Sequence, residues 1–244
     1  MTPIFNKSTP ATLSFLICWG LGLLLLSGTV LFWGYKESFI QIHSQRNLIF
    51  DLCMPWITFL GNGGVAGTIG WILLRKKGNN NIITFVIILI VTGFAVQGLK
   101  RGPFLDWNRP PFELQDTIPI YTLPQKKLMR HSFPSGHATT AAAWAITMIL
   151  LGKYRKRWVG IAIACVGLAI GYSRIYLGVH FPGDVLAGFI FGGGIAWLFI
   201  HFLHPKWERW FPKLNTSKIL KWTFTILAIV SLAYELYQDY PTAY

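Results

Sequence analysis

Long apolar stretches alternate with short polar segments along the chain. Six of them lie near residues 12–34, 52–74, 82–99, 136–152, 158–173 and 185–203. A shorter stretch lies near 222–238. Most approach the roughly 20 residues that an α-helix needs to cross a bilayer, and we expect the short ones around Trp144 and Cys165 to extend into their polar flanks. The pattern predicts an all-α bundle of six transmembrane helices, with the C-terminal stretch crossing as a seventh helix or lying at the interface.

The composition excludes an ordinary soluble globule. Of 244 residues, 53% are hydrophobic and 13% charged, and the mean hydropathy is +0.46. We expect a single integral-membrane domain over 1–244, with its core at 52–203 and a basic tail plus an extra hydrophobic segment at 204–244. The first stretch could be a signal peptide, because Lys7 precedes it. Its length and the lack of a small-residue cleavage site favour a retained helix.

The Lys and Arg residues set the expected orientation. With a cytoplasmic N-terminus, the inner segments hold 13 of the 22 basic residues and a single acid, Glu208. Short cytoplasmic loops are enriched in Lys and Arg. This predicts a multi-pass protein of the bacterial inner membrane, with the loop 100–135 and the segment 173–184 facing the periplasm or cell exterior.

The net charge of +13 could also indicate nucleic-acid binding. The basic tail 206–221 contains Trp207 and Trp210, however, and cations with tryptophans beside a span are typical of contact with anionic lipid at the interface. We therefore expect the bilayer as a partner, with no nucleic acid and no obligate protein partner.

Cysteine and glycine add two smaller expectations. Cys18, Cys53 and Cys165 all fall in apolar stretches without a CxxC pair, so we expect small core residues and neither a disulfide framework nor a zinc site. Gly188 and Gly192 form a GxxxG pair, which predicts close helix packing within the fold.

The segment Pro134-Ser135-Gly136-His137 precedes an Ala- and Thr-rich helix. Ser135 is placed to cap that helix, and a helix N-terminus attracts anions. His137 would then stand beside the bound anion, where it could donate a proton. An ordinary capped helix with an interfacial histidine is the alternative.

Three clusters of candidate residues follow one another along the chain, and the segment 134–137 is the second of them. The third contains Ser173-Arg174, His180 and Asp184. Pro182 fits the first turn of a helix, so Asp184 can reach back toward the His180 ring. A carboxylate that holds one ring nitrogen leaves the other free as a nucleophile. The Arg174 guanidinium suits phosphate oxygens. We therefore favour a catalytic role for this cluster over a purely structural role for the His–Asp pair.

The first cluster is the least regular of the three. Lys100 and Arg101 end the third apolar stretch, and Arg109 precedes two prolines. Taken alone, Lys100 could simply extend to the interface. The same outer loop holds further candidate contacts for an anionic head group: Lys126, Lys127 and Arg130. It also holds aromatic residues expected to shape head-group access: Phe104, Trp107, Phe112 and Tyr121.

The outer segments contain no HExxH or DxD spacing, so no metal cage is indicated and no cofactor is expected. Together, the three clusters resemble the signature motifs of the type 2 phosphatidic acid phosphatase (PAP2) superfamily. The second and third motifs match in order and spacing. The first departs, because eight residues separate Lys100 from Arg109 where the family usually has six. Lys100 and Arg101 therefore both remain candidates for the motif cation.

The resemblance implies a metal-independent lipid phosphatase with a phosphohistidine intermediate. His180 would attack phosphorus, Asp184 would orient it, and His137 would protonate the leaving oxygen. The expected phosphate ligands are Lys100 or Arg101, Arg109, Ser135, Gly136 and Arg174.

The substrate stays open among lipid phosphates and diphosphates such as undecaprenyl diphosphate, phosphatidylglycerophosphate and lipid A. Transfer of the phosphoryl group to another lipid is a further alternative. A non-catalytic lipid-binding or transport protein is a third, but the spans are nearly free of the ionisable groups that transporters place there.

Overall fold

The computed structural model describes residues 9–120, 129–212 and 217–239, and the regular elements of these residues are all helical. The predicted all-α bundle is confirmed. The α-helices and one π-helix (η1) are α1 (Pro10–Trp33), α2 (Tyr35–His43), α3 (Leu48–Phe59), α4 (Gly63–Leu74), α5 (Asn79–Arg101), α6 (Pro110–Glu113), α7 (Gly136–Leu151), α8 (Arg157–Tyr176), α9 (Pro182–Leu198), η1 (Phe199–Leu203), α10 (His204–Trp210) and α11 (Lys218–Asp239).

Within the described residues, five helical segments are long and apolar enough to cross a membrane. They are Pro10–Trp33, Asn79–Arg101, Arg157–Tyr176, Pro182–Trp210 and Lys218–Tyr237. The C-terminal stretch thus forms a helix of spanning length.

The stretch predicted near 52–74 is not one straight helix. It forms α3 and α4, which bend by 73° at residues 60–62 and would count together as a sixth span. The break contains Gly61 and Asn62, and Gly63 begins α4. The N–H of Asn62 donates to the carbonyl of Phe59 at 3.1 Å. Glycine disfavours the helix interior, so the sequence permits the bend there. The bend brings the middle of this stretch next to the first turn of α7.

Helix α7 occupies the centre of the bundle. It is 16 residues long, and most of its side chains are buried. Its small residues allow α9 to approach closely: a Cβ on Gly188 would lie 2.6 Å from the carbonyl oxygen of Ser135, and one on Gly192 would lie 2.1 Å from that of Thr139. The close packing predicted from this glycine pair is confirmed.

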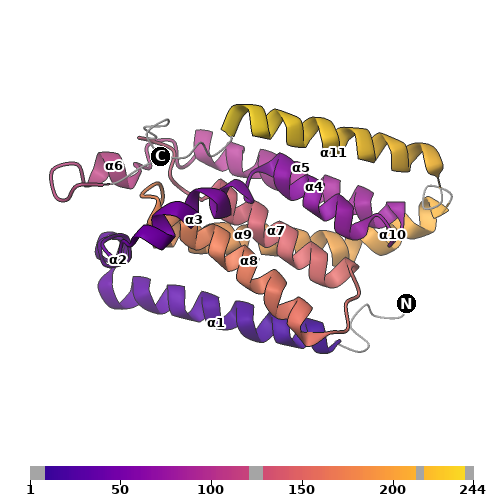
Figure 1. Cartoon of the computed structure of the whole chain (residues 1–244), viewed down its shortest axis with the longest axis horizontal. Coiled ribbons are helices and arrows are strands. Elements are labelled where there is room, and N and C mark those ends of the chain that lie inside the picture. Colours follow the sequence, from indigo (N-terminus) through magenta and orange to yellow (C-terminus); the bar gives the residue numbers. More distant parts are fainter. Residues whose placement is uncertain (1–8, 121–128, 213–216, 240–244) are drawn as a thin grey trace.

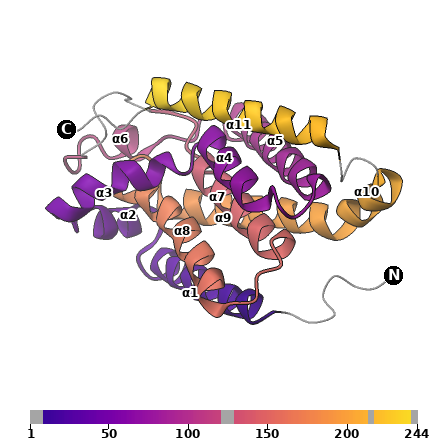
Figure 2. The ribbon, with the colours of Figure 1, turned by 45° about the vertical axis from the view of Figure 1, so that its right-hand side comes forward.

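The first and last helices lie at opposite edges of the bundle (Figure 1). Helix α1 packs along α8, whereas α11 packs along α4 and borders α5 (Figure 2). The ends of α5 and α8 and the beginnings of α7 and α9 lie at the same end of the molecule. That end holds all three sequence clusters.

The prediction that the cysteines are core residues was wrong for Cys53 and Cys165. Cys53 and Cys165 are exposed on the surface of the bundle, and Cys18 is half-buried. The sulfur atoms of Cys18 and Cys165 lie 3.9 Å apart. A membrane helix can be apolar on its lipid-facing side as well as on its buried side, so hydropathy alone did not show which face the cysteines occupy.

Candidate active site

His180 lies in the short turn between α8 and α9 and is 2% exposed. Its Nδ1 atom lies 3.3 Å from Oδ2 of Asp184 and 3.3 Å from the hydroxyl of Ser132. Its Nε2 atom lies 3.2 Å from Nη1 of Arg109. Because a guanidinium can only donate hydrogen bonds, Nε2 is the accepting nitrogen and the ring proton is assigned to Nδ1. The Nε2 lone pair thus faces the cation.

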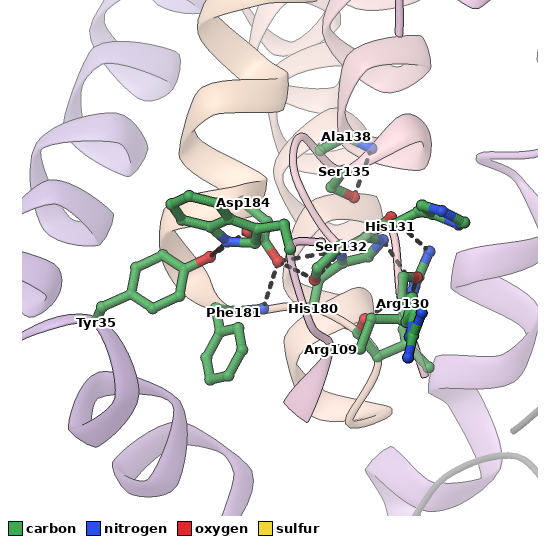
Figure 3. A network of polar contacts seen from close by, with 12 residues as sticks. Tyr35, Arg109, Arg130, His131, Ser132, Ser135, Ala138, His180, Phe181 and Asp184 are labelled. Atoms are coloured by element: carbon green, nitrogen blue, oxygen red, sulfur yellow. Dashed lines mark hydrogen bonds and ion pairs between the residues drawn. The ribbon is translucent and has the colours of Figure 1, made fainter. Parts of the chain in front are cut away.

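Asp184 occupies the first turn of α9 and is fully buried. The backbone N–H of Phe181 donates to its Oδ2 at 3.0 Å, and the hydroxyl of Ser132 donates to the same oxygen. The hydroxyl of Tyr35 donates to Oδ1. Figure 3 shows these donors converging on the carboxylate from opposite sides. They hold Asp184 in one orientation toward His180.

Arg109 is buried at the beginning of α6, and backbone carbonyls hold its guanidinium. Nε donates to the carbonyl of Arg130 at 2.9 Å, Nη1 to that of Val179 at 2.9 Å, and Nη2 to that of His131 at 3.3 Å. The loop from Arg130 to Ser132 therefore positions both the cation and the Asp184 brace (Figure 3).

Two further cations approach the site from α5 and α8. Arg174 is buried, and its Nη1 donates to the hydroxyl of Thr58 at 2.6 Å. Lys100 is also buried, and its charge interacts with those of Arg109, Arg174 and Asp184. Arg101 is exposed. Of the two candidates for the first-motif cation, the structure brings Lys100 to the site.

The beginning of α7 supplies the second cluster. Ser135 is buried, and its hydroxyl accepts the N–H of Ala138 at 3.5 Å as the N-cap of the helix. Its own N–H donates to the carbonyl of Asp184 at 3.0 Å, which joins the starts of α7 and α9. Gly136 and His137 line a cavity of about 310 Å³ together with Asn62 and Gln97. His137 thus lines this cavity at the beginning of α7, and its charge acts on the His180 imidazole.

Burial and charge together set the state of His180. Burial, followed by the charges of Arg109, Lys100, Arg174 and His137, lowers the pKa of the His180 imidazole well below 6.5. The ring is therefore neutral at pH 7, as a nucleophile requires. Burial also lowers the pKa of Arg109 to about 10, which leaves it charged. Burial and the neighbouring Asp184 raise the pKa of Tyr35, so its hydroxyl stays a donor.

Sequence reasoning missed Tyr35, Ser132 and Thr58. Ser132 lies three residues before Ser135, and its proximity to the second motif was the available signal. Tyr35 and Thr58 are distant in sequence, and no pattern marked them. Arg130, predicted as a head-group contact, is exposed and contributes its backbone carbonyl. Lys126, Lys127 and Tyr121 lie outside the described residues.

Two of the predicted loop aromatics gather beside the site. Phe104 and Trp107 pack against Phe133 with ring centroids 4.6 and 5.4 Å away. The indole N–H of Trp107 donates to the Tyr35 hydroxyl at 2.8 Å. Phe112 is exposed on α6. Through Tyr35, the aromatic loop thus connects directly to the Asp184 brace.

No group of three or more His, Cys, Asp or Glu side chains in the described ranges could hold a metal ion. The positive charge around His180 comes instead from Lys100, Arg109 and Arg174.

Comparison with known proteins decides the family. Residues 81–208 match the PAP2 superfamily. The chain belongs to the PAP2 superfamily. The family predicted from the three motifs is confirmed, and this PAP2 protein carries the third motif at the end of α8 and the start of α9.

Individual PAP2 relatives resemble the chain over different lengths. It is 46% identical over 77 residues to the lipid A 4'-phosphatase of Bacteroides thetaiotaomicron, with 32% of this chain and 33% of that protein covered. It is 32% identical to the undecaprenyl-diphosphatase of Sulfolobus acidocaldarius, with 51% of this chain and 54% of that protein covered. These matches thus span about a third and about half of the two relatives. The undecaprenyl-diphosphatase BcrC of Bacillus subtilis is 41% identical over 68% of this chain and 82% of its own length.

A solved structure supports the architecture. The crystal structure of Aquifex aeolicus LpxE aligns with a TM-score of 0.56 at 26% identity and covers 69% of this chain and 95% of that one. With the helices of spanning length, this likeness identifies a multi-pass membrane protein.

Proposed function

We propose that this PAP2 protein hydrolyses lipid phosphates or diphosphates through a phosphohistidine at position 180. One observation carries the proposal: the His180 ring has its Nδ1 atom against Asp184 and its Nε2 lone pair beside Arg109. An oriented, neutral imidazole next to a cluster of cations is suited to attack a phosphoryl group whose negative charge those cations balance.

In the first step, Nε2 of His180 forms a bond to phosphorus, and the bond from phosphorus to the lipid oxygen breaks. His137 gives its proton to that leaving oxygen. Asp184 stabilises the positive charge that develops on the His180 ring. Lys100, Arg109 and Arg174, with Ser135 and the Gly136 N–H, hold the phosphoryl oxygens.

In the second step, water replaces the imidazole on phosphorus. His137, now neutral, takes a proton from the attacking water. The N–P bond breaks, inorganic phosphate leaves, and His180 returns to its neutral state. The cycle restores both histidines and requires only water as co-reactant.

The substrate class follows from the setting of the site. His180 lies at one end of a membrane bundle, so an amphiphile with a phosphate head group can present phosphorus there while its chains stay in the bilayer. Relatives named undecaprenyl-diphosphatase and lipid A 4'-phosphatase support this class. The basic inner segments further favour a site that faces the outside of the bacterial inner membrane.

The test is phosphate release in detergent from undecaprenyl diphosphate, phosphatidylglycerophosphate, phosphatidate and lipid A, with and without EDTA. We expect release that survives chelation and falls by orders of magnitude in His180→Ala and His137→Ala. A variant with Cys18, Cys53 and Cys165 changed to Ala serves as the control and should keep its activity.

The same assay separates the alternatives. Release that depends on an acceptor lipid would indicate phosphoryl transfer in place of hydrolysis. Failure to release phosphate from any of the four lipids would contradict the proposed function, and a requirement for Mg²⁺ would contradict its metal-free form.

A further inference from the structure

The C-terminal helix α11 forms one wall of two neighbouring cavities. It lies beyond the residues matched by the family, packs along α4 and borders α5 (Figure 2). The first cavity has a volume of about 320 Å³ and an apolar lining that includes Gly67, Trp71, Ile82, Leu89, Phe224 and Leu227. The second is the cavity of about 310 Å³ that contains His137, and Glu235 of α11 also lines it. Gly63 lines both, so the two cavities adjoin.

Specific contacts fix α11 in this place. Glu235 Oε1 accepts the backbone N–H of Gly64 at 3.0 Å, and its Oε2 accepts the side-chain amide of Asn62 at 3.1 Å. One turn of α4 further along, the Thr68 hydroxyl donates to the carbonyl of Ala228 at 2.9 Å. The carboxylate thus lies at the N-terminus of α4, where negative charge is favoured.

The glycines of α4 divide the contact with α11 into a tight part and an open part. A Cβ on Gly64 would lie 2.5 Å from the Ser231 hydroxyl, so α11 touches the α4 backbone there. A Cβ on Gly67 would meet only Leu89, at 3.8 Å. The apolar cavity is therefore open at Gly67.

The side of phosphorus on which the leaving group departs indicates which part of the substrate lies in the apolar cavity. If His137 protonates the leaving oxygen, the lipid portion of the substrate must depart on the His137 side of phosphorus. That side is the polar cavity, which shares Gly63 with the apolar one.

We propose that α11 completes the substrate site: the hydrocarbon chain of the lipid phosphate lies between α4, α5 and α11, and its head group passes along the polar cavity to His137. This inference rests on the proposed function. In a membrane, a chain gains little from leaving lipid for protein, so such a groove selects by shape and packing. We therefore expect residues of α11 to determine which lengths and shapes of hydrocarbon chain the enzyme accepts.

A narrowing variant tests the groove. Gly67→Leu places a side chain in the apolar cavity, and Gly194→Leu is the matched control, because a Cβ at Gly194 on α9 meets nothing within 4 Å and the residue lines neither cavity. The substrates are undecaprenyl diphosphate and its short counterpart isopentenyl diphosphate. We expect Gly67→Leu to lower kcat/KM at least tenfold for the long chain and less than twofold for the short one, with both values unchanged in the control.

Equal effects of Gly67→Leu on both substrates, or no effect on the long one, would contradict the proposal that the chain lies in this groove. Phosphate release by the wild type would still support the proposed phosphatase activity. Failure of the wild type to release phosphate from any lipid phosphate would instead contradict the proposed function.

A second measurement does not depend on the folding of the Gly67 variant. A long-chain alkyl phosphate with a diazirine at the end of its chain is photolysed with His180→Ala protein. We expect crosslinks on α11, at Phe224 or Leu227, that unlabelled alkyl phosphate suppresses and the corresponding alkanol does not. Equal competition by the alkanol, or crosslinks confined to other helices, would show that ordinary bilayer lipid fills the cavity and would overturn the proposal.

Discussion

The His180 ring lies between the Asp184 carboxylate and the Arg109 guanidinium, with Nε2 3.2 Å from Nη1 of Arg109. This contact does two things at once. It fixes the tautomer, because the guanidinium must donate to the unprotonated nitrogen. It also places the cation next to the atom that would bond to phosphorus, so a bound phosphoryl group would meet its nucleophile and one of its counter-charges together.

The first prediction concerns the charge state of His180. Burial and nearby cations disfavour the imidazolium, so the pKa lies below 6.5 and the ring stays neutral at pH 7. A ¹⁵N-histidine NMR titration, assigned with His180→Gln, should show no protonation of His180 between pH 8 and about pH 6. A midpoint at or above 6.5 would contradict the electrostatic account. Direct titration is preferable to a rate profile, because substrate phosphate also titrates near pH 6.

The second prediction separates the two cations that end α5. Lys100→Ala should lower kcat/KM by about 100-fold or more, since it removes a buried charge from the oxyanion environment. Arg101→Ala should change it less than about twofold, because an exposed cation interacts weakly with the site through water. Steady-state kinetics on one lipid phosphate suffice. The reverse order of effects would assign the motif cation to Arg101.

The third prediction concerns Tyr35, which donates to the Asp184 carboxylate. Tyr35→Phe keeps the ring and removes the hydrogen bond, so kcat should fall about tenfold, as for one lost bond to a charged group. KM should stay nearly constant, because Tyr35 positions Asp184 and is not expected to touch substrate. Tyr237→Phe, at an 85% exposed position, is the control. A change in KM alone would indicate a substrate contact instead.

The fourth prediction concerns the packing of α7 against α9. Gly192→Ala places a Cβ 2.1 Å from the Thr139 carbonyl oxygen, so the helices must separate, and we expect a loss of about 1–3 kcal/mol in unfolding free energy. Gly194→Ala meets no neighbour and should be neutral or slightly stabilising. Thermal unfolding in detergent compares the two. Equal melting temperatures would show that the helices do not meet at Gly192.

The sequence was most informative where a local signal coincided with a structural role. Ser135 caps α7 and Asp184 reaches back to His180, as their spacing indicated. Such contacts span three or four residues, so helix geometry alone determines them. The preference for Lys100 over Arg101 could not be read in this way, because adjacent residues point to different sides of a helix whose buried face was unknown.

Contacts between segments that are distant in the chain could not be predicted from the sequence. Tyr35 reaches Asp184 across 149 residues, and Thr58 reaches Arg174 across 116. Both are ordinary residues in or beside apolar stretches, and their roles follow from how the helices pack. The bend between α3 and α4 was hidden for a similar reason, because Gly61 and Gly63 leave an apolar stretch nearly as hydrophobic as an unbroken one.

The central claim is that His180 itself receives the phosphoryl group. The most direct measurement is a pre-steady-state reaction with ³²P-labelled lipid phosphate, quenched in alkaline denaturant and mapped by proteolysis. We predict label that is stable to base and labile to acid, located on His180 and lost in His180→Gln. Turnover without protein-bound label, label on another residue, or an active His180→Gln enzyme would contradict the mechanism.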